Sequence, residues 1–379
     1  MKLPRFRLED YLAQYEFKAP YLFCCSDAES WTQKEILDLA DAEMQEAWGN
    51  LNLGYTEVPG HPLLREAIAR LYPGLTAENI LCFGGAEEGI FCSANVLCRA
   101  GDHAIVFTPC YQSLQDLPLS LGAEVTGIEL KEKDRWLPDL DALKSAIRPN
   151  TRALLINFPH NPTGAMLPAA IEQEILNLAD QHGFNIFSDE VYRLLGGGGT
   201  SWRPPLATQS PNAISLGVVS KAYGLPGLRI GWIACQDTRL LKEIEYVKYY
   251  TSICCSAPSE LLSTIALRSG EKLLERNNAL VNSNLKLLDH FFEKHTQHFS
   301  WVRPQGGCVG FVHYKGKTPV DTLAQELIQQ QGVLIVPGSI FSAPGNDFRI
   351  GFGRKNMPEV LARFEAFEGF KLGAEVAKA

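Results

Sequence analysis

Short apolar runs alternate with helical patterns between about residue 60 and residue 235. The runs read NILCF (79–83), HAIVF (103–107), RALLINF (152–158), FNIFS (184–188) and AISLGVVS (213–220). A segment between them, AAIEQEILNLADQHG, has helical periodicity, and Gly183 is expected to end that helix. Apolar strands that alternate with helices predict an α/β fold with a mostly parallel sheet covered on both faces.

The two ends of the chain have a different pattern. Residues 1–45 have a mainly helical composition, and a long helical stretch after about residue 240 leads to short strands such as GVLIVPG and DFRIGFG. We therefore predict a large α/β domain at residues 46–255. A smaller α+β domain is expected to combine residues 1–45 with residues 256–379.

Composition and charge narrow the class of protein. The 379 residues are 46% hydrophobic and 21% charged, which is ample for a large core. A net charge of -8 argues against general nucleic-acid binding, and no apolar run is long enough to span a membrane. The start, MKLPRFRLEDYLAQYEF, lacks the apolar centre of a secretory signal. The ten cysteines form no CxxC pair, so we expect buried reduced thiols, no metal site and a cytoplasmic location.

Candidate functional residues follow the ends of the predicted strands. They are Gly84 and Gly85 after 79–83, Asn161 after 152–158, Asp189 and Tyr192 after 184–188, and Lys221 after 213–220. Because ligands of open parallel sheets bind beyond the carboxyl ends of the strands, these elements are expected to face one cleft. A lysine at such a buried strand end can have a lowered pKa and act as a nucleophile.

Each motif by itself also has an ordinary structural interpretation. NPTG is a good turn, GGAEEG can simply begin a helix, and Lys221 can extend to solvent from a strand terminus. The chain has neither a G-x-x-x-x-G-K-[ST] loop nor a G-x-G-x-x-G after the first strand. This excludes a P-loop nucleotide site and argues against a dinucleotide site.

In combination the motifs resemble one family. NPTG, SDEVY, SKAYGLPGLRIG and FRIGFGR, in this order, are similar to the fold-type I pyridoxal-phosphate enzymes, specifically the class I/II aminotransferases of the aspartate aminotransferase superfamily. The resemblance extends from GYTEVPGHPLLREAIA to FRIGFGR. It implies a seven-stranded sheet flanked by helices, pyridoxal 5'-phosphate as cofactor, and transfer of an amino group between an amino acid and a 2-oxo acid.

The resemblance also implies roles around the cofactor ring. Lys221 would form a Schiff base with the cofactor and then shuttle the proton between the substrate Cα and the cofactor. Asp189 would pair with the pyridine nitrogen. Asn161 and Tyr192 would donate hydrogen bonds to the phenolic oxygen, and Tyr111 would stack on the ring.

The remaining implied contacts lie at the phosphate and the substrate. Arg229, Ser220 and the backbone of Gly85, Ala86 and Glu87 would hold the phosphate. Tyr55 would reach the phosphate of a neighbouring subunit, which implies a homodimer with shared active sites. Arg349, with Asn161 beside it, would bind the substrate α-carboxylate through its planar fork, whereas Arg354 is expected to be a surface or structural residue.

The chain also departs from the family pattern. Val218 stands where many relatives have a hydroxyl for the phosphate, and Glu87 and Glu88 replace small or amide side chains. The CCSDAESW segment lacks the usual glycine-bearing stretch that closes over substrate, and LEDYL is similar to the start of the capreomycidine-synthase branch. No second arginine can be assigned to a dicarboxylate substrate.

Two other activities fit the same motifs. A pyridoxal-phosphate-dependent C–S β-lyase or an amino-acid cyclase would need the same lysine, aspartate and arginine. A regulator that uses this fold as a sensor is disfavoured, since such regulators carry an extra N-terminal DNA-binding domain and this chain has only about fifty residues before the matching region.

Overall fold

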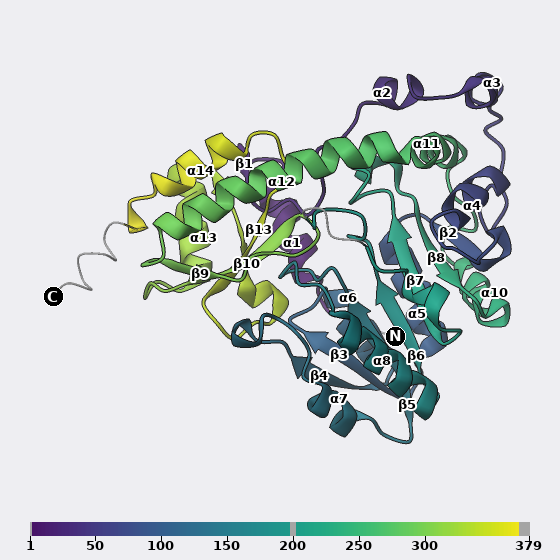
Figure 1. Cartoon of the computed structure of the whole chain (residues 1–379), viewed down its shortest axis with the longest axis horizontal. Coiled ribbons are helices and arrows are strands. Elements are labelled where there is room, and N and C mark those ends of the chain that lie inside the picture. The colour runs from purple at the N-terminus through teal and green to yellow at the C-terminus, as the bar shows by residue number, and fades with distance from the viewer. Residues whose placement is uncertain (1, 198–201, 371–379) are drawn as a thin grey trace.

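A seven-stranded sheet forms the centre of the computed structural model, which describes residues 2–197 and 202–370 (Figure 1). Its strand order is β2-β8-β7-β6-β5-β3-β4. The strands are β2 (Ile80–Phe83), β3 (His103–Thr108), β4 (Glu124–Glu129), β5 (Thr151–Asn157), β6 (Asn185–Asp189), β7 (Ala213–Val218) and β8 (Gly231–Cys235). Only β8 runs antiparallel to its neighbours in this sheet. The predicted fold class is confirmed.

Helices cover this sheet, and its central strands are buried on both faces. The helices are α4 (Pro62–Ala69), α5 (Ala86–Leu97), α6 (Gln112–Ser120), α7 (Leu140–Ala146), α8 (Ala169–His182), α9 (Leu206–Gln209), α10 (Thr238–Lys248) and α11 (Ala257–Arg268). Every residue of β7 is buried, which explains its unbroken apolar run. Gly183 ends α8 with a φ of 69°, as predicted.

A smaller α+β unit uses both ends of the chain. Its antiparallel sheet has the order β12-β13-β10-β9, and a separate parallel pair joins β1 to β11. The elements are β1 (Tyr21–Leu22), β9 (Phe299–Trp301), β10 (Val309–Tyr314), β11 (Val333–Leu334), β12 (Val336–Pro337), β13 (Asp347–Gly351), α13 (Val320–Gln331) and α14 (Met357–Glu365). The long helix α12 (Gly270–Lys294) runs from α11 to this unit (Figure 1). The exact domain boundaries stay predictions, and residues 371–379 lie outside the described residues.

The N-terminal region is less helical than its composition indicates. It contains α1 (Arg7–Tyr15), α2 (Gln33–Leu37) and α3 (Ala42–Gly49), with an extended segment between α1 and α2. That segment pairs with distant backbone: Tyr21 N donates to Gly332 O at 3.2 Å, and Gly351 N donates to Phe23 O at 3.2 Å. Tertiary pairing therefore overrides local helix propensity here.

Two further expectations concern the whole chain. All ten cysteines are free thiols, and all except Cys254 are buried, as predicted. Within residues 2–197 and 202–370, no helix combines the length and the apolar character that crossing a membrane requires.

Candidate active site

A cavity of about 120 Å³ lies beyond the carboxyl ends of β5 and β6. Its lining comes from eight parts of the chain: α1, the segment before α2, the starts of α5 and α6, the ends of β5 and β6 with the turns that follow them, the turn after β7, and β13. The lining residues are Leu8, Glu9, Leu12, Ser26, Ala86, Glu87, Ile90, Tyr111, Asn157, Asn161, Asp189, Val191, Tyr192, Lys221 and Arg349. The structure thus brings Asn161, Asp189, Tyr192, Lys221 and Arg349 together.

Lys221 lines this cavity. Its Nζ donates a hydrogen bond to Ser26 Oγ at 2.9 Å and lies 5.8 Å from the centroid of the Tyr192 ring. Burial lowers the pKa of the ammonium, but electrostatic interactions with Tyr192, Asp27 and Cys308 raise it, and the net shift is upward. A net lowering of this pKa, which a buried strand end makes possible, is therefore not seen in the polypeptide alone.

Asp189 is the last residue of β6 and is buried. Burial raises the pKa of its carboxyl to about 7, although Val191 N donates to Oδ1 at 3.1 Å and Lys221 is nearby. The backbone carbonyl of Asp189 accepts a hydrogen bond from Asn157 Nδ2 at 2.9 Å, which ties β6 to β5. A cationic partner in the cavity would stabilise the ionised form of this carboxyl.

Arg349 supplies a fully buried positive charge from β13, with 1% of its surface exposed. Its Nη1 donates to Asn161 Oδ1 at 3.1 Å and its Nη2 to Cys24 O at 3.0 Å, whereas Nε has no partner. No carboxylate of the described chain pairs with this guanidinium. A buried cation without a counter-ion is costly, so the site is suited to an anionic ligand.

A second anion site lies at the start of α5. Gly85 precedes this helix with a φ of 110°, and a Cβ there would lie 2.5 Å from Arg229 Nη2. Gly231 packs equally closely, since a Cβ there would lie 2.7 Å from the Gly85 carbonyl carbon. The missing side chains let the Arg229 guanidinium approach the helix N-terminus, where backbone N–H groups also favour an anion. Ser220 Oγ is buried without a partner, whereas Arg229 is exposed, and neither lines the cavity itself.

Comparison with known proteins identifies the family. The model of the class I and II aminotransferases matches residues 25–364. The chain belongs to this family. It is 30% identical to capreomycidine synthase of Streptomyces vinaceus over 92% of this chain and 90% of that protein. Among solved structures it is similar to a PLP-dependent aminotransferase from Streptococcus suis (TM-score 0.92, 33% identity, 97% and 98% of the two chains). It is also similar to the PLP-dependent cyclase OrfR (TM-score 0.87, 25% identity, 97% of each chain).

The aminotransferase family uses pyridoxal phosphate, and the cavity residues fit this cofactor. Tyr192 Oη lies beside Ser26 but makes no hydrogen bond of normal geometry with any described residue, so it can donate to a bound ring. Asp189 offers a buried carboxyl for a protonated nitrogen, and the Gly85–Arg229 contact offers a phosphate site. The chain is a pyridoxal-phosphate-dependent aminotransferase of fold type I.

Tyr111 and Tyr55, the two aromatic residues predicted around the cofactor, have different positions. Tyr111 lines the cavity just before α6, and its ring lies 5.6 Å from the Phe6 ring at an interplanar angle of 53°. Tyr55 is 92% exposed and does not line the cavity of its own chain. Its role at a neighbouring subunit stays a prediction.

The structure shows where the residues that depart from the family pattern lie. Val218 is buried at the end of β7 and offers no polar atom. Glu88 accepts hydrogen bonds from Gly84 N at 2.6 Å and Ser252 N at 3.0 Å, so its carboxylate is bound outside the cofactor cavity. Arg354 pairs with Asp27 at 2.9 Å and 3.1 Å, which agrees with the expected structural role.

The N-terminal contribution to the site was not predictable from the amino-acid sequence. Leu8, Glu9 and Leu12 of α1 and Ser26 all line the cavity. The alternation of apolar and polar positions in RLEDYLAQY indicates an amphipathic helix, but it does not reveal which cavity that helix covers. The docking is set by long-range contacts such as Tyr11 Oη, which donates to Ile335 O at 2.8 Å.

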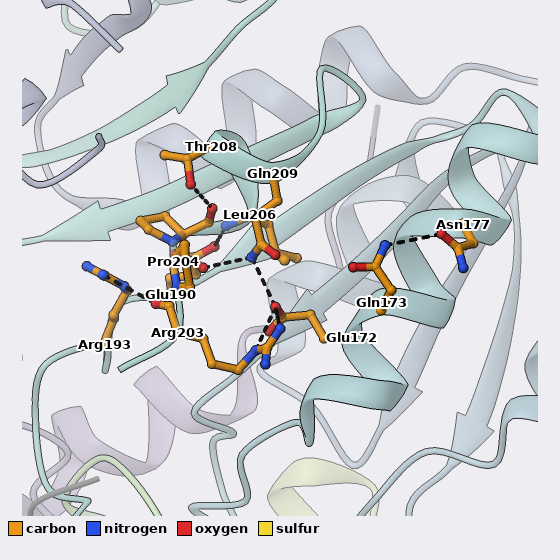
Figure 2. A network of polar contacts seen from close by, with 11 residues as sticks. Glu172, Gln173, Asn177, Glu190, Arg193, Arg203, Pro204, Leu206, Thr208 and Gln209 are labelled. Carbon is orange, nitrogen blue, oxygen red and sulfur yellow. Dashed lines mark hydrogen bonds and ion pairs between the residues drawn. The ribbon is translucent and has the colours of Figure 1, made fainter. Parts of the chain in front are cut away.

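A polar network surrounds Glu172 and Glu190, the second of which directly follows Asp189 (Figure 2). Glu190 Oε1 accepts hydrogen bonds from Leu206 N at 3.0 Å and Ser215 Oγ at 2.6 Å. On α8, Glu172 Oε1 accepts from Arg203 Nε at 2.8 Å and from Gln209 Nε2 at 3.0 Å. These contacts fasten the residues after β6 to α8, α9 and β7.

Proposed function

We propose that Lys221, Asp189 and Arg349 are the central residues of the transamination that this chain performs. The observation that carries the proposal is their convergence: an amine, a buried carboxyl and a buried, unpaired guanidinium all line one cavity. The substrates are an amino acid and a 2-oxo acid, which occupy the same site in alternating half-reactions.

The cofactor, when bound, supplies an electron sink that accepts the electron pair of the substrate Cα–H bond. Lys221 would hold it through Nζ, and the same amine, when not bonded to the cofactor, would take the proton from the substrate Cα and return it as a general acid. Ser26 Oγ, which accepts a hydrogen bond from Nζ, orients this amine. Asp189 would favour a protonated pyridine nitrogen, because a positive charge there would stabilise its buried carboxylate.

The remaining residues bind and orient. Tyr192 Oη and the amide nitrogen of Asn161 would donate to the ring oxygen of the cofactor, since Asn161 Oδ1 already accepts from Arg349. Arg349 would bind the substrate α-carboxylate in its planar fork. Arg229, Ser220 and the backbone of Gly85–Ala86–Glu87 would hold the phosphate.

The functional unit in this proposal is a homodimer. Large apolar side chains that are exposed in the single chain support it, and they occur before α4 and around the end of α10: Leu53, Tyr55, Tyr246, Tyr249, Tyr250 and Ile253. Tyr55 would contact the phosphate in the partner's site. The free, buried thiols support a reducing, cytoplasmic location.

A second candidate reaction is an amino-acid cyclisation on the same cofactor, and the likeness to capreomycidine synthase and to the cyclase OrfR favours it over the lyase. The test is the visible absorbance of the purified wild type and of Lys221→Ala as amino acids are added without a 2-oxo acid. Transamination predicts a spectral change and one equivalent of 2-oxo acid per site in the wild type, with neither in the variant. Catalytic formation of a cyclic product, or of ammonia and pyruvate, would contradict transamination.

A further inference from the structure

The charges of the active-site cavity fall into two groups. Lys221, Asp189 and Arg349 are assigned to the cofactor and the substrate carboxylate. The other acidic side chains that line the cavity are Glu9 and Glu87. Among the described lining residues there is no lysine or arginine apart from Lys221 and Arg349. The part of the cavity left for the substrate side chain therefore has carboxyl groups and no basic group.

Glu87 has no positive partner in this cavity among the described residues. Its Oε1 accepts a hydrogen bond from Ser113 Oγ, and its Oε2 makes no hydrogen bond of normal geometry, although the Tyr111 hydroxyl lies beside this carboxyl. No lysine or arginine of the described chain forms an ion pair with Glu87. Burial raises the pKa of this carboxyl, and a cation placed beside it would stabilise the ionised form.

Glu9 lies on α1 at the same cavity and is exposed. The helix is held in place by Gln112 Oε1, which accepts from Arg7 N at 2.9 Å. The cations of this region are used elsewhere: Arg7 Nη1 donates to Ser339 O at 3.4 Å, and Arg5 pairs with Asp10. Glu9 thus presents a carboxylate between two apolar lining residues, Leu8 and Leu12.

The region next to the cavity has the same charge. A groove of about 520 Å³ shares Glu87 with the cavity, and its ionisable lining residues are Glu87, Glu88 and Asp116. Its other walls are mostly apolar, with Leu3, Phe6, Phe91 and Leu117. Apolar walls concentrate the field of nearby charges, so both hollows attract cations.

Two buried polar groups of the same cavity are available to a ligand. Arg349 Nε and Tyr192 Oη line the same cavity, each belongs to a side chain exposed by 1%, and neither has a partner in the described chain. A substrate whose α-carboxylate lies at Arg349 would direct its side chain past Leu8 and Leu12 toward the acidic groups.

We infer that the amino-acid substrate has an aliphatic side chain that ends in a cation, an ammonium or a guanidinium, and that Glu9 and Glu87 select it. The inference rests on the proposed function. Leu8 and Leu12 contact the methylene groups, and the two carboxylates bind the terminal charge. A dicarboxylic amino acid would place its second carboxylate against these acids, which disfavours it by like-charge repulsion.

The test uses the cofactor-loaded enzyme and measures binding. Lysine, ornithine, arginine, norleucine, aspartate and glutamate are titrated without a 2-oxo acid, and binding is read from the visible spectrum and from the shift in the thermal unfolding midpoint. We expect at least one basic amino acid to half-saturate at a concentration about tenfold or more below that of norleucine, the uncharged analogue of lysine. Aspartate and glutamate should bind more weakly still.

Variants that remove one carboxylate each test whether Glu9 and Glu87 cause the preference for basic amino acids. Glu9→Gln should weaken binding of the basic amino acid by roughly fivefold, because Glu9 is exposed and its charge is screened. Glu87→Gln should weaken it more, while norleucine changes little in both variants. Asp10→Asn, which removes a charge from the same helix outside the cavity, is the matched control and should have no effect.

The outcomes separate the inference from the proposed function. If norleucine or glutamate binds as tightly as every basic amino acid, the inference is wrong and the transaminase assignment is unaffected. The inference is also wrong if Glu9→Gln and Glu87→Gln leave the preference unchanged. An enzyme that responds to no amino acid in either readout contradicts both.

Discussion

At the residue scale, the site depends on a few polar side chains, of which Tyr192 Oη and Arg349 Nε have no partner among the described residues. Asn161, Asp189, Tyr192 and Lys221 were predictable from sequence, since each lies at the end of a strand of a parallel sheet or in the turn after it. Ser26 was not predictable, because its contact with Lys221 joins parts of the chain that only the tertiary fold brings together. The raised pKa of Lys221 was missed for the same reason, since it depends on Asp27 and Tyr192.

Arg349→Lys tests the carboxylate site. Lysine keeps the charge but loses the planar fork that donates to Asn161 and Cys24, so the substrate should lose one charge-assisted hydrogen bond. We expect roughly tenfold to hundredfold weaker amino-acid binding, equivalent to about 1.5–3 kcal/mol. Titration of the holoenzyme with amino acid measures this, and cofactor affinity should stay unchanged. Unaltered substrate affinity would remove Arg349 from its assigned role.

Ser26→Ala tests the orientation of the Lys221 amine. The variant removes the oxygen that accepts from Nζ, so we expect kcat to fall roughly tenfold while KM changes little. The alkaline limb of the pH profile should also shift, because the environment of Nζ has changed. Ser26→Thr keeps the hydroxyl and should restore most of kcat. A uniform loss in both variants with an unchanged pH profile would indicate a packing role only.

Asp189 gives a pH dependence with a definite sign. Its pKa rises from 3.8 to about 7 on folding, so the folded chain holds a proton that the unfolded chain has lost. Stability of the cofactor-free protein should therefore fall as pH rises from about 4 to about 7, and this contribution should level off above 7. Thermal unfolding of the wild type and of Asp189→Asn isolates the contribution of this carboxyl. The stability of the variant relative to the wild type should increase as pH rises over that range. A constant difference between the two would contradict the buried-carboxyl account.

At the element scale, the start of α5 and the docking of α1 decide how the site is built. The GGAEEG motif indicated a helix start with an anion site, and the structure adds the reason for the glycine: its φ of 110° and the close Arg229 guanidinium exclude a side chain. The position of α1 over the cavity was not predictable, because its apolar face fits any hydrophobic groove. Hydrogen bonds from α1 to Ile335 and Gln112 determine which groove this helix occupies.

Gly85→Ala tests the phosphate site at this scale. The added Cβ would collide with Arg229 Nη2, so we expect cofactor affinity to fall tenfold or more, which corresponds to about 1.4 kcal/mol. Gly74→Ala is the matched control: Gly74 also has a positive φ of +87°, but nothing lies within 4 Å of a Cβ there. Equilibrium titration with pyridoxal phosphate measures both. Equal losses in the two variants would mean that backbone strain, not the Arg229 contact, is responsible.

At the scale of the whole molecule, the sequence predicted the α/β class, the parallel sheet and the use of both chain ends in a smaller unit. It did not predict that the segment around Tyr21 and Phe23 is extended, because its pairing with Gly332 and Gly351 is a long-range contact. The exposed position of Tyr55 is explained in our account by a second subunit.

Mixing of subunits tests this shared site. Lys221→Ala removes the amine from its own site, and Tyr55→Ala should weaken the phosphate site of the partner. A hybrid dimer of the two variants would contain one intact site, so random mixing should recover activity in about a quarter of all sites. Refolding the two variants together, with each one alone as control, measures the recovery. Mixed samples no more active than the separate variants would place Tyr55 outside the neighbouring site.

The most direct test of the central claim is to locate the covalent link between cofactor and chain. The holoenzyme is reduced with borohydride, digested and examined by mass spectrometry. Our account predicts one modified peptide, containing Lys221, and none after prior conversion with a substrate amino acid that releases the lysine. Modification at a different lysine, or no cofactor on any peptide of the unconverted enzyme, would contradict the assignment of Lys221 and the mechanism built on it.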